Sequence, residues 1–334
     1  MRWTVALLFV GACGFGSPSR SGDDHGGDDG TGPGPDGSGG PAGTWWNQAW
    51  SARMRIVIDN AVPLPAGFQI GLPRDLDAAP CSGPRSAVRV VRDHTTELAR
   101  VIDELGGDEW IWFRLAAAVP ASVGPSEYWL YCGNAAAGDA PSNPTDVFDA
   151  YDDFDGSTLS SAWVKQGTVV VGGGGVNVDG NNAGIYSTMA YGAGTATDFI
   201  MQATSNALGD PWFWGGFEVA FTVVAPWVIW HSHAANMVWP EELRSGTNPS
   251  TMSRKPIDTA PHLYGVEHYG TSAGFRYGNM SVGSLSYGGT ISQAMNVRLH
   301  NYQSGGTIQF QMARVRKAVA PIPAVTVGEV EARP

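Results

Sequence analysis

The fold class of this chain is decided by residues 53–59, which read RMRIVID. The apolar residues Met54, Ile56 and Ile58 occupy every second position, and two arginines alternate with them. Side chains along a β-strand point in turn to the two faces of a sheet. This spacing therefore predicts a strand with one buried face and one solvated face.

The same period of two recurs along the chain, between segments rich in Gly, Pro, Ser and Asp. It is found at residues 88–91, 110–115, 128–132, 217–223, 295–300 and 307–312. Gly (45), Pro (22) and Trp (13) are plentiful, whereas long stretches of helix-forming residues are missing. We predict an all-β chain of antiparallel sheets with few, short helices.

The charge of the chain excludes one class of partner. Lys and Arg number 20 against 31 Asp and Glu, which gives a net charge of -11. Such a chain repels a phosphate backbone, so nucleic acid is not an expected partner. No motif for a cofactor is present, and none is predicted.

The first thirteen residues have the layout of a bacterial export signal. A charged start is followed by the apolar stretch 5–10 and by Gly11-Ala12-Cys13. The apolar stretch is far shorter than the roughly 20 residues that span a bilayer as a helix. Residues 10–13 resemble the lipobox of bacterial lipoproteins, in which the cysteine becomes lipidated; the alternative is an ordinary secretory signal with an incidental cysteine.

Residues 14–44 read as a tether rather than as a folded unit. They are nearly all Gly, Ser, Pro and Asp, with almost nothing to bury, which is typical of disordered spacers. A lipidated Cys13 anchors a protein to a membrane without spanning it. Because Gly14 is not the Asp that retains lipoproteins at the inner membrane, we expect an exported envelope protein at the outer membrane or cell surface.

The rest of the chain is long enough for two folded modules. The turn-rich stretch 135–144 separates two series of strands, which predicts β-sandwiches over residues 45–144 and 145–334. Once Cys13 is lipidated, Cys81 and Cys132 remain as a pair. An oxidising compartment favours a disulfide between them, and a shared metal ion is the weaker alternative.

From residue 45 onward the motifs resemble a known arrangement. Residues 53–60, 111–115 and 129–134 resemble three strands of the domain of unknown function 2341, although Cys132 stands where that family has an aromatic residue. Residues 151–159, with Trp163, resemble the start of a concanavalin A-like jelly roll, and 313–317 and 323–329 resemble its end. This resemblance implies a jelly roll as the second module and assigns no chemistry to the first.

Glycoside hydrolysis requires two carboxylates on either side of the scissile bond. The Glu-x-Asp-x-x-Glu pattern of jelly-roll glucanases is missing. Glu241 and Glu242 are adjacent, so a strand directs them to opposite faces, and Glu218 stands alone among apolar neighbours. The sequence therefore favours binding over hydrolysis. Asp152, Asp153 and Asp155 are either calcium ligands or caps of a turn.

Two histidines are weak candidates for a metal site. His231 and His233 share one face of a strand, a spacing that suits a metal ion, and Glu241, His262 or His268 are conceivable further ligands. No spaced motif ties in a third ligand, so a hydrogen-bonded pair is the favoured interpretation.

Tryptophans crowd one stretch of the second module, and exposed rings of this kind stack on the C–H faces of sugars. The candidates are Trp212, Trp214, Trp227, Trp230 and Trp239. Alternation places Trp227 and Trp230 on opposite or offset faces, so at least one of them is expected in the core.

These features predict a lipid-anchored, non-enzymatic surface protein whose jelly roll binds carbohydrate or another surface protein. A polysaccharide-acting enzyme and a purely structural envelope component are the alternatives. The membrane, through the anchor, and a polysaccharide are the expected partners.

Overall fold

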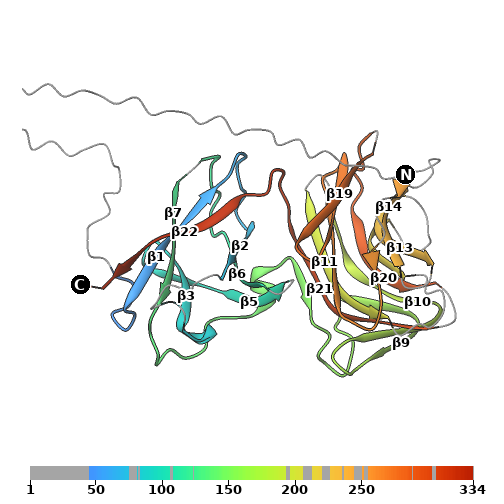
Figure 1. Ribbon diagram of the computed structural model, residues 1–334, viewed down its shortest axis with the longest axis horizontal. Coiled ribbons are helices and arrows are strands. Elements are labelled where there is room, and N and C mark those ends of the chain that lie inside the picture. The colour runs from blue at the N-terminus through green and yellow to red at the C-terminus, as the bar shows by residue number, and fades with distance from the viewer. Residues whose placement is uncertain are drawn as a thin grey trace, which may run out of the picture. The chain divides into compact units, whose positions relative to one another are not determined.

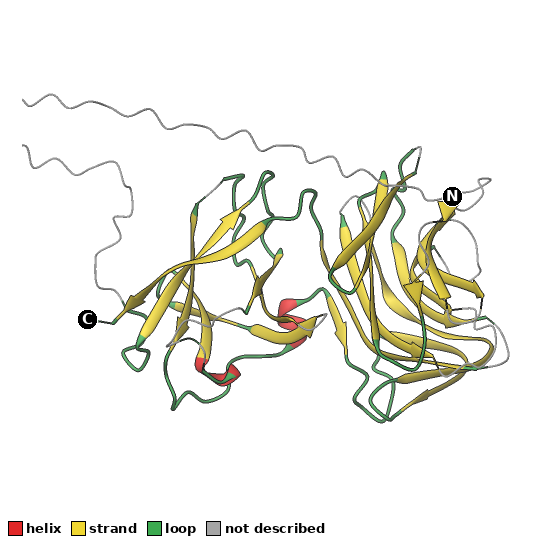
Figure 2. Cartoon of the chain, viewed as in Figure 1, coloured by secondary structure: helices red, strands yellow, loops and turns green. Residues whose placement is uncertain are grey.

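In this computed structural model the regular secondary structure is almost entirely β-strand, as Figure 2 shows. The structure describes residues 45–74, 81, 83–105, 108–122, 124–192, 196–205, 213–219, 226–234, 237–243, 250–251, 255–287, 289–302 and 306–333. Cys13 and the predicted tether lie outside these residues. The described part contains two short helices, η1 (Arg85–Ala87) and α1 (Pro144–Val147). No described helix has the length and apolarity needed to cross a membrane.

The first sandwich consists of two antiparallel sheets. The larger has the order β22, β1, β7, β3, β4, with bounds β22 (Ala324–Ala332), β1 (Ala52–Asp59), β7 (Pro125–Cys132), β3 (Val88–Arg92) and β4 (Thr96–Leu98). The smaller has the order β2, β6, β5, with bounds β2 (Gln69–Pro73), β6 (Asp108–Arg114) and β5 (Arg100–Leu105). Their inner faces form one apolar core.

Strand β1 has the alternation that its sequence predicts. Met54, Ile56 and Ile58 are buried between the two sheets. Arg53 and Arg55 point to the other face, where both guanidinium groups lie over the ring of Trp129, at 4.5 and 5.3 Å from its centroid. The arginines thus pack their charge on an aromatic ring while the apolar residues form the core.

The last strand of the chain belongs to the first sandwich. β22 pairs with β1 along its whole length, from Ala52 opposite Ala332 to Asp59 opposite Ala324 (Figure 1). The sequence boundary at residue 144 had placed this segment at the end of the second module. Valines at alternate positions specify a strand but not its partner, so the pairing is a finding of the structure.

The second sandwich is a 14-stranded antiparallel sheet that curls over its own core. The main path is β15, β14, β13, β12, β20, β10, β21, β11, β17, β18, β19, while β16, β8 and β9 pair with β14, β21 and β10. The bounds are β8 (Ala150–Asp152), β9 (Trp163–Val171), β10 (Val176–Tyr191), β11 (Thr197–Ser205), β12 (Phe213–Glu218), β13 (Trp227–Ala234), β14 (Met237–Leu243), β15 (Ser250–Thr251), β16 (Lys255–Pro256), β17 (His262–His268), β18 (Ser272–Tyr277), β19 (Met280–Ser286), β20 (Met295–Asn301) and β21 (Thr307–Lys317).

The 16-residue strand β10 joins the two halves of this curled sheet. Its first part pairs with β21 and its second part with β20. The two halves face each other across a core that includes Phe199, Phe217, Trp230, Phe275 and Phe310. The predicted fold class, two antiparallel β-sandwiches of which the second is a jelly roll, is confirmed.

Cys81 and Cys132 form a disulfide, as predicted. Their Cα atoms lie 5.1 Å apart, and both residues are buried in the first core. The bond joins the end of β7 to a position 51 residues earlier in the chain. Closing a loop of that length stabilises a fold by about 4 kcal/mol in the chain-entropy view.

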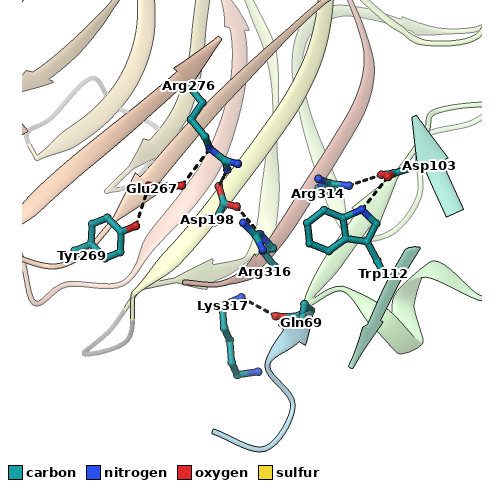
Figure 3. Close-up of polar contacts among 10 residues, drawn as sticks. All are labelled: Gln69, Asp103, Trp112, Asp198, Glu267, Tyr269, Arg276, Arg314, Arg316 and Lys317. Carbon is teal, nitrogen blue, oxygen red and sulfur yellow. Dashed lines mark hydrogen bonds and ion pairs between the residues drawn. The ribbon is translucent and has the colours of Figure 1, made fainter. Parts of the chain in front are cut away.

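Buried charges join the two sandwiches (Figure 3). Arg314 of β21 is completely buried and pairs with Asp103 of β5, which also accepts a hydrogen bond of 2.8 Å from Nε1 of Trp112. The guanidinium lies 4.5 Å from the ring centroid of Trp112 and 5.1 Å from that of Phe148. Burial lowers the pKa of Arg314, so the charge depends on Asp103 for compensation.

A second carboxylate organises the neighbouring strands. Asp198 of β11 is buried and is contacted by Arg276 of β18 and by Arg316, whose Nε lies 2.5 Å from Oδ2. These two arginines hold the pKa of Asp198 at about 2, although burial alone raises it. Arg276 also pairs with Glu267 at 3.1 Å. Apolar contacts of Ile200 with the Trp112 and Phe148 cluster complete the junction.

We expect Asp103→Asn to destabilise the protein more than Arg314→Met does. The first change leaves a guanidinium of zero exposure without its carboxylate, whereas the second leaves a carboxylate that keeps 19% exposure. Removing one partner of a buried pair, so that the other charge stays buried and uncompensated, costs about 3–5 kcal/mol. Urea unfolding measures the difference.

The matched control for these variants is Arg85→Met. Arg85 pairs with Glu109, but its side chain is 53% exposed. Exposed pairs contribute about 1 kcal/mol or less. An equal loss of unfolding free energy in all three variants would contradict the importance assigned to burial at the junction.

Candidate functional site

One outer face of the jelly roll gathers aromatic and charged side chains on strands β12, β13 and β20. Register explains how they meet, because Trp214 lies opposite His231 on one side and opposite His300 on the other. Directly paired residues of antiparallel strands share a face. We call the set Trp214, Glu218, Trp227, His231, Arg298, His300 and Tyr302 the aromatic face.

The rings of the aromatic face contact one another closely. The centroid of Trp214 lies 5.0 Å from that of Trp227, 5.2 Å from that of His231 and 5.0 Å from that of Tyr302. His300 and Tyr302 are 4.1 Å apart. All four pairs are tilted or edge-to-face, and the ring quadrupoles favour such arrangements over face-to-face stacking.

A glycine makes room for one of these rings. Gly184 of β10 lies opposite His300, and a Cβ atom at this position would overlap the imidazole ring. A residue with a side chain at position 184 would therefore displace the ring. The glycine is a sequence signal for the site, but it identifies no partner until the register of β10 and β20 is known.

The charges of the aromatic face cancel within it. Nη1 of Arg298 lies 2.8 and 3.0 Å from the two carboxylate oxygens of Glu218, and both residues are buried. The same guanidinium lies 5.3 Å from the ring centroid of Tyr302. Glu218 is therefore held in an ion pair. Glu241 of β14 shares this face by register, opposite Ile229, but its side chain lies outside the described residues.

Several polar atoms of the face lack a hydrogen-bond partner. Among the described residues this is true of Nε1 of Trp214, Nε1 of Trp227 and the hydroxyl of Tyr302, all of which are buried. Buried donors are rarely left unpaired in native proteins, because each costs about 1–3 kcal/mol. Three such donors beside aromatic rings indicate a place where a polar ligand or ordered water completes the bonding.

The predicted tryptophans fall into three groups. Trp214 and Trp227 lie together on the aromatic face. Trp230 points to the opposite face, where it is completely buried and donates from Nε1 to the carbonyl of Gly265 at 2.9 Å. Trp212 and the side chain of Trp239 lie outside the described residues. The prediction that Trp227 and Trp230 take opposite faces is confirmed.

The prediction of exposed tryptophan rings is wrong for the described residues. Trp214 is 5% exposed and Trp227 7% exposed, because each packs against the other and against its neighbours on the sheet. Their ring faces are covered, and their Nε1 atoms are buried. The segments 206–212, 220–225 and 235–236, which adjoin the ends of these strands, lie outside the described residues.

The described metal candidates have other partners. His231 contacts Trp214, and the side chain of His233 lies outside the described residues. His262 pairs with Asp258, and His268 contacts the hydroxyl of Tyr287 at 2.9 Å. In the part of the chain that the structure describes, no three His, Cys, Asp or Glu side chains form a metal-binding group.

The aspartates at the start of the jelly roll have a structural role. Asp152 accepts hydrogen bonds from the backbone N–H of Phe154 and from Nε1 of Trp163, both at 2.9 Å. Asp153 accepts from the backbone N–H of Asp155. Of the two interpretations of these residues, the structure supports the capped turn.

Comparisons with known proteins give a family match over part of the chain. The model of a family described as Domain of unknown function (DUF2341) matches residues 85–166, which confirms that resemblance over this range. None of the curated proteins matches the chain in sequence.

Three solved structures illustrate the likeness, each over about half of this chain. An endo-acting O-glycanase from the human gut microbiota has 14% identity and a TM-score of 0.43, covering 51% of this chain and 98% of its own. The laminarinase of Rhodothermus marinus has 11% identity and a TM-score of 0.43, with 52% and 98% covered. The carbohydrate binding module CBM66 of Bacillus subtilis has 11% identity and a TM-score of 0.35, with 50% and 96% covered. Similarity at this level concerns strand arrangement and transfers no function.

We expect His300 to make stability depend on pH in the acid range. Burial, and then the charge of Arg298, lower its pKa from 6.5 to about 3. Below pH 6.5 the unfolded chain therefore binds a proton that the folded protein does not, and stability falls as the pH falls towards 3. His300→Gln removes this contribution.

The measurement is the urea midpoint of wild type and His300→Gln at several pH values between about 7 and 4. The free energy of unfolding of the variant is expected to depend less steeply on pH than that of the wild type, by up to about 1 kcal/mol per pH unit. His268, whose pKa burial lowers to about 4, leaves part of the slope in both proteins. Parallel profiles would show that His300 protonates in the folded state.

Proposed function

We propose that this chain is an exported, lipid-anchored protein that binds neutral carbohydrate through the aromatic face and does not cleave it. The observation that carries the proposal is the grouping of aromatic rings with the unpaired donors of Trp214, Trp227 and Tyr302. In this proposal the described residues are the floor of the binding site.

The chemistry of a sugar suits such a floor. A saccharide presents hydroxyl oxygens that accept hydrogen bonds and C–H groups that pack against the edges of aromatic rings. Two indole N–H groups and one phenol supply the donors. Because Arg298 neutralises Glu218, this pair offers no net charge to attract an ionic ligand. A neutral saccharide satisfies both the packing and the hydrogen bonding.

Binding without cleavage is supported by the state of Glu218. Hydrolysis requires one carboxyl group as a proton donor and a second carboxylate as a nucleophile or base. Glu218 is 1% exposed and held by Arg298 through both oxygens. A carboxylate with these contacts is poorly placed to transfer a proton, so we assign the face to recognition.

The anchor is proposed from the sequence alone. The export signal ends at Cys13, and the acidic spacer 14–44 gives the folded modules reach from a membrane. We propose the cell envelope, at the outer membrane or cell surface, as the location. The outer membrane or cell surface is preferred to the inner membrane because Gly14, and not Asp, follows the cysteine.

A glycan array probed with the purified full-length chain is expected to show binding to neutral oligosaccharides. Trp214→Phe removes one N–H group and Tyr302→Phe one hydroxyl, and each is expected to lower the affinity about three- to tenfold. Isothermal titration with the best array ligand measures the change, and a reducing-sugar assay is expected to show no release.

The matched control is Tyr264→Phe. It removes a hydroxyl from a buried tyrosine on the core side, where the group donates to the carbonyl of Pro256 at 2.7 Å. This variant should lose stability and keep its affinity. Unchanged affinity in Trp214→Phe and Tyr302→Phe would reject the aromatic face as the binding site. Release of reducing ends would favour the alternative, a polysaccharide-acting enzyme.

Mass spectrometry of the mature protein tests the anchor. We expect a protein that begins at Cys13 and carries the mass of a diacylglyceryl group and an acylated amine. Cys13→Ser is expected to abolish the lipid and leave the protein out of the membrane fraction. An unmodified mature N-terminus in the wild type would reduce the anchor to simple secretion.

A further inference from the structure

A second polar site lies where the first residues of β17 adjoin the last residues of β18, away from the aromatic face. A cavity of about 580 Å³ is lined there by Gln202 of β11, His262 of β17, Tyr277 of β18, the following Gly278, and Glu104 of β5. Small-ligand sites in proteins have volumes of about 300–1,000 Å³. None of these residues belongs to the aromatic face.

A chain of hydrogen bonds fixes the polar groups at the wall of this cavity. Nε2 of His262 lies 3.0 Å from Oδ1 of Asp258, and Nδ1 lies 2.8 Å from the hydroxyl of Tyr277. A carboxylate can only accept, so in the neutral ring the proton is on Nε2 and Nδ1 is the acceptor. The hydroxyl of Tyr277 therefore donates to His262, which leaves its oxygen free to accept from a ligand.

The ring of Tyr277 is held as firmly as its hydroxyl. Its centroid lies 5.4 Å from that of His262 and 5.7 Å from that of Tyr264, and Nζ of Lys255 lies 5.9 Å from it. Gly278 has a φ of 59°, and its N–H donates to the carbonyl of Leu263 at 2.9 Å. The strand end that carries Tyr277 is thus fixed before any ligand arrives, which lowers the cost of binding.

The acceptors at the cavity define the ligand. The phenol oxygen of Tyr277, the carboxylate of Glu104 and the amide of Gln202 all accept hydrogen bonds, and hydroxyl groups are the donors that match them. The exposed carboxylate of Glu104 repels an anion. The chemistry fits a neutral molecule with several hydroxyl groups and an apolar face for the ring of Tyr277.

We infer that this cavity is a second saccharide site, which binds a neutral oligosaccharide through Tyr277, Glu104 and Gln202. Asp258 and His262 are positioning residues, because they orient the hydroxyl of Tyr277 and need not touch the ligand. The inference extends the proposed carbohydrate function to a second place on the jelly roll, yet it rests on its own residues. Two sites on one chain bind a polysaccharide with avidity.

The test is an NMR titration of the full-length chain labelled with ¹⁵N-histidine. The probes are cellotetraose, xylotetraose and laminaritetraose as neutral sugars and tetragalacturonic acid as an anionic one. The chain has 7 histidines, and the ring signals of His262 and His300 are assigned by substituting each residue. Movement of the His262 signal reports binding at this cavity, and movement of the His300 signal reports binding at the aromatic face. The two proposals are therefore tested independently.

We expect at least one neutral probe to shift the His262 signal in a saturable manner. Tyr277→Phe keeps the ring, loses the oxygen acceptor, and is expected to weaken this binding about three- to tenfold. Glu104→Gln keeps the shape of the side chain and removes its charge. This variant is therefore expected to bind tetragalacturonic acid, whereas the wild type is expected not to bind it. Tyr302→Phe serves as the control and should leave the His262 titration unchanged.

Two results would overturn the inference. One is a His262 signal that stays fixed with every neutral probe at millimolar concentration. The other is a Tyr277→Phe variant that binds as the wild type does while Glu104→Gln still refuses the anionic probe. Because Glu104 lies at an exposed strand end, its variant is expected to fold, and the test remains decisive if Tyr277→Phe does not.

Discussion

The structure depends on a guanidinium group that has no water around it. Arg314 is fully buried between the rings of Trp112 and Phe148, and Asp103 is the carboxylate that compensates its charge. A charge in such a place is tolerated only where a partner from another part of the chain is held beside it. The jelly roll therefore needs β5 of the first sandwich at this position. The same contact brings Glu104, the residue after Asp103, to the cavity lined by His262 and Tyr277.

The order of the strands along the chain adds a second constraint. β1 and β7 lie inside the first large sheet. β22, which pairs with β1, follows the whole jelly roll in the sequence. In sequence, the jelly roll lies between β7 and β22, which are the two neighbours of β1 in that sheet. Both ends of the jelly roll are therefore tied to the first sandwich. Apolar contacts at the junction and the ion pair of Arg314 act on a chain whose geometry is already restricted.

Much of the fold could be predicted from the sequence, because period-two patterns report burial directly. Residues 53–59 specified a half-buried strand, and the spacing of Trp227 and Trp230 assigned them to opposite faces. Partnership between distant strands is not encoded in such a pattern. The pairing of β22 with β1 and the meeting of Trp214 with His300 and Tyr302 therefore required the structure. The burial of Trp214 and Trp227 was missed for the same reason, since their covering neighbours come from other strands.

A sandwich has two outer faces, and this jelly roll uses them differently. The face that carries Arg314, Arg316 and Ile200 is partly occupied by the first sandwich, and its polar groups are matched by carboxylates. The aromatic face has no partner from the described part of the first sandwich, yet it holds buried N–H and O–H groups that lack acceptors there. A face that needed only to be stable would have no use for unpaired donors, because apolar residues of similar size would pack there at lower cost. Under the proposed function, the unpaired donors of Trp214, Trp227 and Tyr302 on this face bind a ligand.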